Sequence, residues 1–226
     1  MKVTREQVAK NRQRILKVAS KLFREKGFDG VSVADIMKRA GLTHGAFYGH
    51  FASKDELAAQ ACANAVANTI DTWSAWTALA GDNSADQLGA IVSAYVTPRH
   101  RDDLGGGCVL AALGADAVRQ RGAVRRTFTD GIRSTAAMLS MIAPGPSNAA
   151  QREKALATLA GLVGALTLAR AADDPTLSDE ILNAALSTFG GKSGATDVAI
   201  QARLRGTNRK KIKGGQTDWS PPPGPH

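Results

Sequence analysis

Between residues 4 and 57 the sequence alternates helix-starting residues with glycines that end helices, and this spacing restricts the region to short packed helices. Apolar residues recur at helical spacing over residues 4–26, and Gly27 follows as a helix-ending residue. Ser32 and Asp35 form a capping-box pattern, so a second helix should begin after Ser32. Gly41 ends that helix after two turns. The pattern predicts a long helix followed by a very short one.

A third short helix is expected from about residue 44 to residue 50, with Thr43 as its N-cap. Phe47 and Phe51 are four residues apart and therefore point to one side, where they can pack on the first helix. Ser53 begins an S-x-x-E capping box, which opens a long helix over residues 54–79. Two short helices joined by a glycine-containing turn, packed on a longer one, are typical of a helix-turn-helix.

The rest of the chain also predicts helices, over about residues 85–97, 108–120, 122–143, 149–171 and 177–189. No alternation of period two suggests a sheet, so the expected fold class is all-α. We expect a three-helix domain over residues 1–53 and a helical ligand-binding and dimerisation domain over residues 54–190. A glycine- and proline-rich, disordered basic tail is expected over residues 191–226.

The positive charge is concentrated at the two ends of the chain. Residues 1–60 hold 12 Lys and Arg against 6 Asp and Glu, and residues 191–226 hold 7 against 2, within a net charge of +9. A basic N-terminal segment on a near-neutral body indicates a protein that binds a polyanion with one region. The alternative is a solvated surface bias.

Other function classes receive no support from the sequence. Two cysteines do not make a secreted disulfide framework, which favours a reducing, cytoplasmic location. The longest uncharged apolar run, between Lys154 and Arg170, is 15 residues, shorter than the ~20 that span a bilayer, so no membrane association is expected. The four histidines lack metal-ligand spacing, and no catalytic motif is present. We therefore expect no enzyme activity, no catalytic residues, no metal and no cofactor.

The N-terminal segment resembles the DNA-binding domain of the TetR/AcrR family of transcriptional regulators. The resemblance covers about a quarter of the chain and implies a repressor that binds a palindromic double-stranded DNA operator as a homodimer. It rests on the following groups of residues: Arg14-Ile15-Leu16, Leu22-Phe23, Gly27-Phe28, Ser32-Val33-Ala34-Asp35-Ile36, Ala40-Gly41-Leu42-Thr43, Phe47-Tyr48-Gly49-His50-Phe51 and Lys54-Asp55-Glu56-Leu57.

The resemblance implies a role for each side chain on the outer face of the third helix. Thr43, Gly45 and Ala46 would lie at base edges in the major groove, and His44 is a further candidate for specificity. Flanking phosphates would be bound by Tyr48, His50 and Lys54, with a further phosphate at Ser32 and backbone or minor-groove contacts from Arg5 and Arg14. Tyr48 and His50 can alternatively be half-exposed edge residues of a small core.

The C-terminal helices would sense a small-molecule inducer or a thiol-reactive compound. Cys108 follows three glycines at an expected helix N-terminus, where the helix dipole can favour a reactive thiolate, although a small buried core residue is the plainer interpretation. Cys62 is expected to serve packing alone. The predicted pocket residues are Trp73, Trp76, Cys108, Leu110, Leu113, Phe128 and Met138.

The last two long helices are the expected dimer interface, in a four-helix bundle with the partner. Their apolar positions can instead belong to the core of one chain. The interface positions are Leu156, Leu159, Leu162, Val163, Leu166, Ile181 and Leu186. Two other function classes stay open, a nonspecific DNA-binding protein and an all-helical ligand carrier.

Overall fold

The computed structural model describes residues 4–190, and this part of the chain folds entirely into helices and their connections. The N-terminal elements are α1 (Arg5–Lys26), α2 (Val33–Arg39), the 3-10 helix η1 (His44–Gly49) and α3 (Lys54–Ala80). The others are α4 (Ser84–Tyr95), α5 (Pro98–Asp102), α6 (Val109–Ala117), α7 (Gly122–Ser140), α8 (Asn148–Ala171) and α9 (Pro175–Phe189). The all-α fold class is confirmed. The tail predicted over residues 191–226 lies outside the described residues.

The local capping signals place the N-terminal helices as the sequence predicts. The Thr4 hydroxyl caps α1, and Gly27 ends it with a φ of 74°. Both halves of the capping box form at α2, because the Ser32 hydroxyl accepts the Asp35 N–H while the Asp35 carboxylate accepts the Ser32 N–H. The Ser53 hydroxyl caps α3 in the same way. These caps fix where three of the four N-terminal elements begin.

The third short helix differs from the prediction in type. η1 is a 3-10 helix of six residues rather than an α-helix, and the Thr43 side chain makes no capping hydrogen bond. Gly45 and Gly49 each lower helix propensity by ~1 kcal/mol relative to Ala, and a segment of this length cannot form an α-helix by local forces alone. The element therefore depends on packing against its neighbours.

Helix α5 is absent from the sequence prediction, which leaves residues 98–107 as a connection between two helices. Pro98 instead stands in the first turn, where its missing N–H is harmless, and Thr97 caps the helix by accepting the His100 N–H. The other predicted helices all form, with ends shifted by a few residues. A single-turn helix of five residues carries no periodicity, so pattern alone cannot reveal it.

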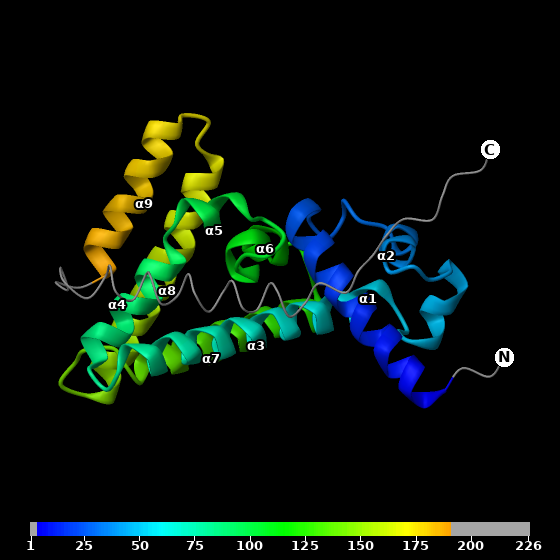
Figure 1. The fold of residues 1–226 in the computed structure, drawn as a ribbon, viewed down its shortest axis with the longest axis horizontal. Helices are drawn as coiled ribbons and strands as arrows, with labels where there is room; N and C mark the ends of the chain where they lie inside the picture. The colour runs from blue at the N-terminus through cyan, green and yellow to red at the C-terminus, as the bar shows by residue number, and fades with distance from the viewer. Residues whose placement is uncertain (1–3, 191–226) are drawn as a thin grey trace.

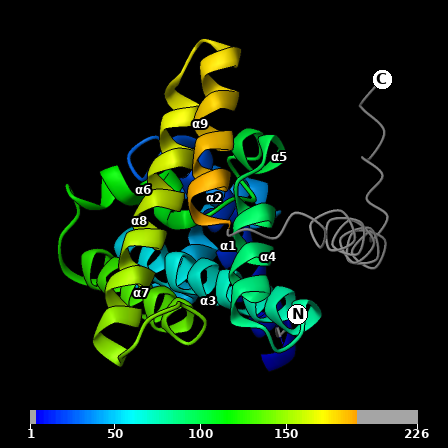
Figure 2. The ribbon, with the colours of Figure 1, turned by 90° about the vertical axis from the view of Figure 1, so that its left-hand side faces the viewer.

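The helices form an elongated molecule (Figure 1). α1, α2 and η1 lie at one end, α3 runs from there alongside α7, and α8 and α9 pair at the opposite end. In Figure 2 that opposite end faces the viewer, with α8 and α9 in front. One continuous cluster of buried apolar residues runs through both halves, and the rings of Phe28 and Phe128 meet at 6.4 Å. The division at residues 53 and 54 falls at the start of α3 and stays a prediction.

Helix α8 is the one described helix that is long and apolar enough to cross a membrane by length and composition. It packs on α7 and α9. Its residues Leu159, Leu162 and Leu166 are buried in the core of the chain. A buried core helix meets the same criteria of length and composition, and 39% of this apolar window is buried within the chain.

Candidate DNA-binding surface and ligand cavity

Two buried phenyl rings anchor η1 and leave its other side in solvent. Phe47 and Phe51 are each 1% exposed, and their rings stack with centroids 5.8 Å apart. Tyr48, between them in sequence, is 69% exposed. The arrangement presents one face of η1 outward.

The residues predicted to touch bases and phosphates lie on or beside this outward face. Thr43, His44 and Gly45 are exposed, and Ala46 is half-buried. A Cβ atom added to Gly45 would meet nothing within 4 Å. The edge residues His50 and Lys54 are half-buried, and Arg5 is exposed on the first turn of α1. The structure thus leaves this set accessible around η1, and their roles stay predictions.

Ser32 is less suited to bind a phosphate than the sequence suggests. Its hydroxyl and its N–H both bond the Asp35 carboxylate, at 2.5 Å and 3.1 Å. These bonds from Ser32 lower the pKa of Asp35, which therefore carries a negative charge at the start of α2. That charge would repel a phosphate. Arg14 is exposed, with one long hydrogen bond of 3.4 Å to the Ala40 carbonyl.

Arg12 is a positioning residue that the sequence analysis missed. Its guanidinium donates to the His50 carbonyl at the end of η1, and to Gln60 Oε1 on α3 at 2.7 Å. The guanidinium carbon also lies 4.2 Å from the centroid of the Phe51 ring, a cation–π contact. One side chain of α1 therefore ties η1 to α3. In sequence it is one of several cations on a helix, and nothing marks it.

A cavity of about 680 Å³ lies between α1, α3, α4, α5 and the turn before α6. Of the predicted pocket residues, Trp73, Trp76 and Cys108 line it. Leu110 and Phe128 instead line a separate apolar groove of about 470 Å³ between α6, α7 and α8.

Two predicted pocket residues line neither space. Leu113 and Met138 are 1% and 6% exposed and belong to the packed core. Neither the cavity nor the groove supports the expectation that these two residues line a pocket, and that expectation stays a prediction. Leucine and methionine at helical spacing cannot be assigned to core or cavity by sequence.

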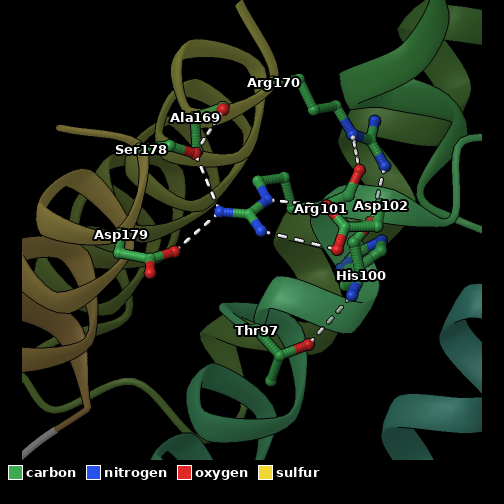
Figure 3. Close-up of polar contacts among 8 residues, drawn as sticks. All are labelled: Thr97, His100, Arg101, Asp102, Ala169, Arg170, Ser178 and Asp179. Atoms are coloured by element: carbon green, nitrogen blue, oxygen red, sulfur yellow. Dashed lines mark hydrogen bonds and ion pairs between the residues drawn. The ribbon is translucent and has the colours of Figure 1, made fainter. Parts of the chain in front are cut away.

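The turn of α5 is fastened to the helices at the far end of the molecule (Figure 3). Arg170 of α8 donates to the carbonyls of His100 and Arg101, at 2.8 Å and 3.0 Å. Arg101 in turn donates to the Ser178 hydroxyl and the Asp179 carboxylate of α9, at 3.0 Å and 2.7 Å. Part of the cavity wall is therefore linked to α8 and α9 by direct hydrogen bonds.

His100 forms a neutral bridge within this wall. Its Nδ1 lies 2.8 Å from the Tyr95 carbonyl, and its Nε2 accepts the Cys108 N–H at 3.0 Å. These partners require a proton on Nδ1 and none on Nε2. Burial lowers the pKa of His100, since it penalises the charged imidazolium. The bridge connects α5 to the start of α6.

The two cysteines occupy different settings. Cys62 is buried within α3, and burial raises the pKa of its thiol to about 12, which agrees with the expected packing role. Cys108 stands at the N-cap position of α6, as the sequence predicts, and lines the cavity although it is 6% exposed. No group of three or more His, Cys, Asp or Glu side chains within residues 4–190 could hold a metal ion.

The predicted dimer interface divides into core and surface. Leu159, Leu162 and Leu166 are 5%, 0% and 1% exposed within the single chain, so they cannot face a partner and the prediction is wrong for them. Gly161 also serves the chain's own packing, since a Cβ there would lie 2.2 Å from the Phe189 ring of α9. The interface positions that keep exposed surface are Leu156, Val163, Ile181 and Leu186.

Comparisons with known proteins agree with this geometry. A family model described as bacterial regulatory proteins of the tetR family matches residues 15–61. The regulator YvdT of Bacillus subtilis is 39% identical over 59 residues, which are 26% of this chain and 30% of that protein. AcrR of Shigella flexneri is 43% identical over 54 residues, 24% of this chain and 25% of that protein. The aligned segment spans under a third of these relatives' lengths.

Similarity over the whole chain comes from solved structures. The reduced form of Escherichia coli NemR superposes with a TM-score of 0.68 at 21% sequence identity, covering 80% of this chain and 95% of that one. At this identity the superposition establishes the fold alone. The curated relatives are named as HTH-type transcriptional regulators rather than enzymes. Residues 15–61 are thus similar to the tetR family of bacterial regulatory proteins, and the described helices share the fold of a solved structure.

Proposed function

We propose that the chain is a DNA-binding transcriptional regulator that inserts η1 into the major groove of its operator. The observation that supports this proposal is the exposed face of η1. Tyr48 is exposed on this face, while Phe47 and Phe51 are buried on the opposite side. A recognition helix needs this division, because base edges can be contacted only by side chains held rigidly outside the core.

The proposed contacts follow from position on that face. Thr43, Gly45 and Ala46 contact base edges, where small side chains permit close approach to the groove, and His44 adds specificity. Five further residues bind phosphates and thereby orient the protein on the duplex: Tyr48, His50, Lys54, Arg5 and Arg14. Ser32 lies at this surface, but its hydroxyl is not free to bind a phosphate, because it donates to the Asp35 carboxylate.

Binding requires two copies, because one short recognition helix reads only a few base pairs. We propose a homodimer formed through α8 and α9, the pair of helices at the end of the molecule away from η1 (Figure 2). Two further leucines of these helices support this surface, since Leu168 is 60% exposed and Leu177 48% exposed. The two copies of η1 would lie ~34–36 Å apart on a palindromic operator.

We further propose that the regulator is a cytoplasmic repressor, released when a small molecule or a thiol-reactive compound binds. The cavity of about 680 Å³ supports this, as does Cys108 in its wall. Release requires only that the ligand prefer the conformation that does not fit the operator.

Selection of bound duplexes from random DNA tests the proposal. Wild type should enrich a palindrome with half-sites one helical turn apart, and Tyr48→Ala should weaken operator binding by about tenfold or more while the melting temperature stays unchanged. Lys10→Ala is the matched control, an exposed substitution on α1 away from η1. Equal affinity for selected and scrambled duplexes at matched salt would indicate a nonspecific DNA-binding protein. Ligand binding without any effect on DNA would indicate a carrier.

A further inference from the structure

The 680 Å³ cavity is lined by more positive than negative charge. Lys17 and Arg24 of α1 and Arg99 of α5 line it, against a single acidic residue, Asp103. The Asp103 carboxylate is already engaged, because it accepts the Gly106 N–H at 2.8 Å. Within residues 4–190, Lys17 and Arg99 form no ion pair within 4 Å. The cavity wall thus carries cations that the protein itself does not neutralise.

Arg24 in this wall and Arg170 near it also form no ion pair within 4 Å among residues 4–190. Arg24 donates to the Gly105 carbonyl and to Ser20 Oγ at 2.9 Å, and burial lowers its pKa. Arg170 donates only to backbone carbonyls, and its Nη1 is buried without any partner. Burial of a cation is normally offset by an anion. Asp103 in the cavity wall interacts electrostatically with both arginines, but within residues 4–190 it forms no ion pair within 4 Å with either.

The cavity wall also holds an unpartnered polar side chain. Tyr95 is 2% exposed and lines the cavity, yet its hydroxyl lies beside Cys108 without meeting any acceptor in hydrogen-bond geometry. A buried hydroxyl without a partner is destabilising by ~1–3 kcal/mol unless a ligand or water bonds it. Trp73 and Trp76 lie in the same wall and offer flat apolar surface. The wall therefore combines positively charged side chains, a tyrosine hydroxyl without an acceptor, and aromatic rings.

We propose that this cavity binds a small organic anion with a flat ring, of the aromatic carboxylate class. The carboxylate would lie between Lys17 and Arg99 and accept the Tyr95 hydroxyl, with the ring against Trp73 and Trp76. The volume lies within the ~300–1,000 Å³ of small-molecule sites. Because Lys17 belongs to α1 and Arg99 to α5, the anion would join the DNA-binding helix directly to the C-terminal helices. This regulatory consequence rests on the proposed function, whereas the binding itself does not.

Isothermal titration of the full chain tests the inference in the absence of DNA. The ligands are benzoate, 2-naphthoate and 4-biphenylcarboxylate, each paired with its neutral carboxamide. At least one carboxylate should bind about tenfold more tightly than its amide, at one site per chain. Lys17→Gln and Arg99→Gln should each weaken that carboxylate about three- to tenfold and leave the amide unchanged. Lys10→Gln removes a cation from the same helix outside the cavity and should have no effect.

Several outcomes would overturn the inference. These are no binding of any of the three acids, equal affinity for acid and amide, or a carboxylate affinity unaffected by either cavity substitution. Since both substituted side chains are exposed, loss of folding is not expected, and a melting curve of each variant checks this. Failure here leaves the DNA-binding proposal intact, and failure of operator binding leaves the titration result unchanged.

Discussion

Replacing Arg12 by Met should destabilise the recognition element more than any other substitution of a partly exposed cation on α1. The change removes the charged hydrogen bonds to the His50 carbonyl and to Gln60, and the cation–π contact with Phe51. Hydrogen bonds to a charged group contribute ~1.5–3 kcal/mol each, and a cation–π contact about 0.5–1 kcal/mol. The side chain is 32% exposed, which favours the low end of these values. The expected loss of unfolding free energy is roughly 2–4 kcal/mol.

Chemical and thermal unfolding, followed by circular dichroism, measure this loss. For a chain of this length each kcal/mol lowers the melting temperature by about 2–4 °C, so the expected drop is roughly 4–16 °C. Arg12→Lys keeps the charge without the planar fork and should recover only part of the stability. Lys10→Met is the control, since Lys10 is 65% exposed in a surface pair with Glu6. A change of less than about 0.5 kcal/mol in Arg12→Met would refute the assigned role.

Three further predictions concern other parts of the fold. Gly27→Ala should lower the unfolding free energy by ~1–3 kcal/mol, because the φ of Gly27 is +74°. Gly114→Ala is the control, since a Cβ there meets nothing within 4 Å, and it should be neutral or stabilising. Urea titrations of the two variants measure the difference. His100 has a lowered pKa in the folded state, so its contribution is complete above its unfolded value of ~6.5 and is lost as pH falls below it. Wild type should lose up to ~1.4 kcal/mol per pH unit more than His100→Gln on acidification, and parallel curves would contradict this. At pH 8 Cys62 should resist thiol reagents until the protein unfolds, because burial raises its pKa to about 12, and mass spectrometry of labelled peptides measures the rate.

Local signals explain why the N-terminal half was predictable from sequence. The capping box at Ser32, the terminating Gly27 and the four-residue spacing of Phe47 and Phe51 each act within one or two turns. Such signals depend only on near neighbours in the chain, so they can be read without knowing the fold. The outward face of η1 follows from them directly.

The C-terminal half depends on contacts between distant residues, which the sequence does not display. The apolar residues of α8 lie on several sides, so periodicity alone cannot separate the inward Leu162 from the half-exposed Val163. The predicted pocket residues divide among a cavity, a groove and the core for the same reason. Helix α5 is held by Arg170, 70 residues from His100, which donates to two of its carbonyls.

Three arginines show how such distant contacts hold the short elements in place. Arg12 bonds the last carbonyl of η1, Arg24 the Gly105 carbonyl before α6, and Arg170 two carbonyls of α5. Each accepting segment is too short, or too rich in glycine, to be stable alone, whereas each arginine is on a long helix. A carbonyl accepts the hydrogen bond but does not neutralise the charge. Arg12 has the Glu56 carboxylate 3.9 Å away, whereas within residues 4–190 neither Arg24 nor Arg170 has an ion pair within 4 Å. Of these three arginines, only Arg24 lines the cavity, so a ligand bound there would contact one of the side chains that position the short segments.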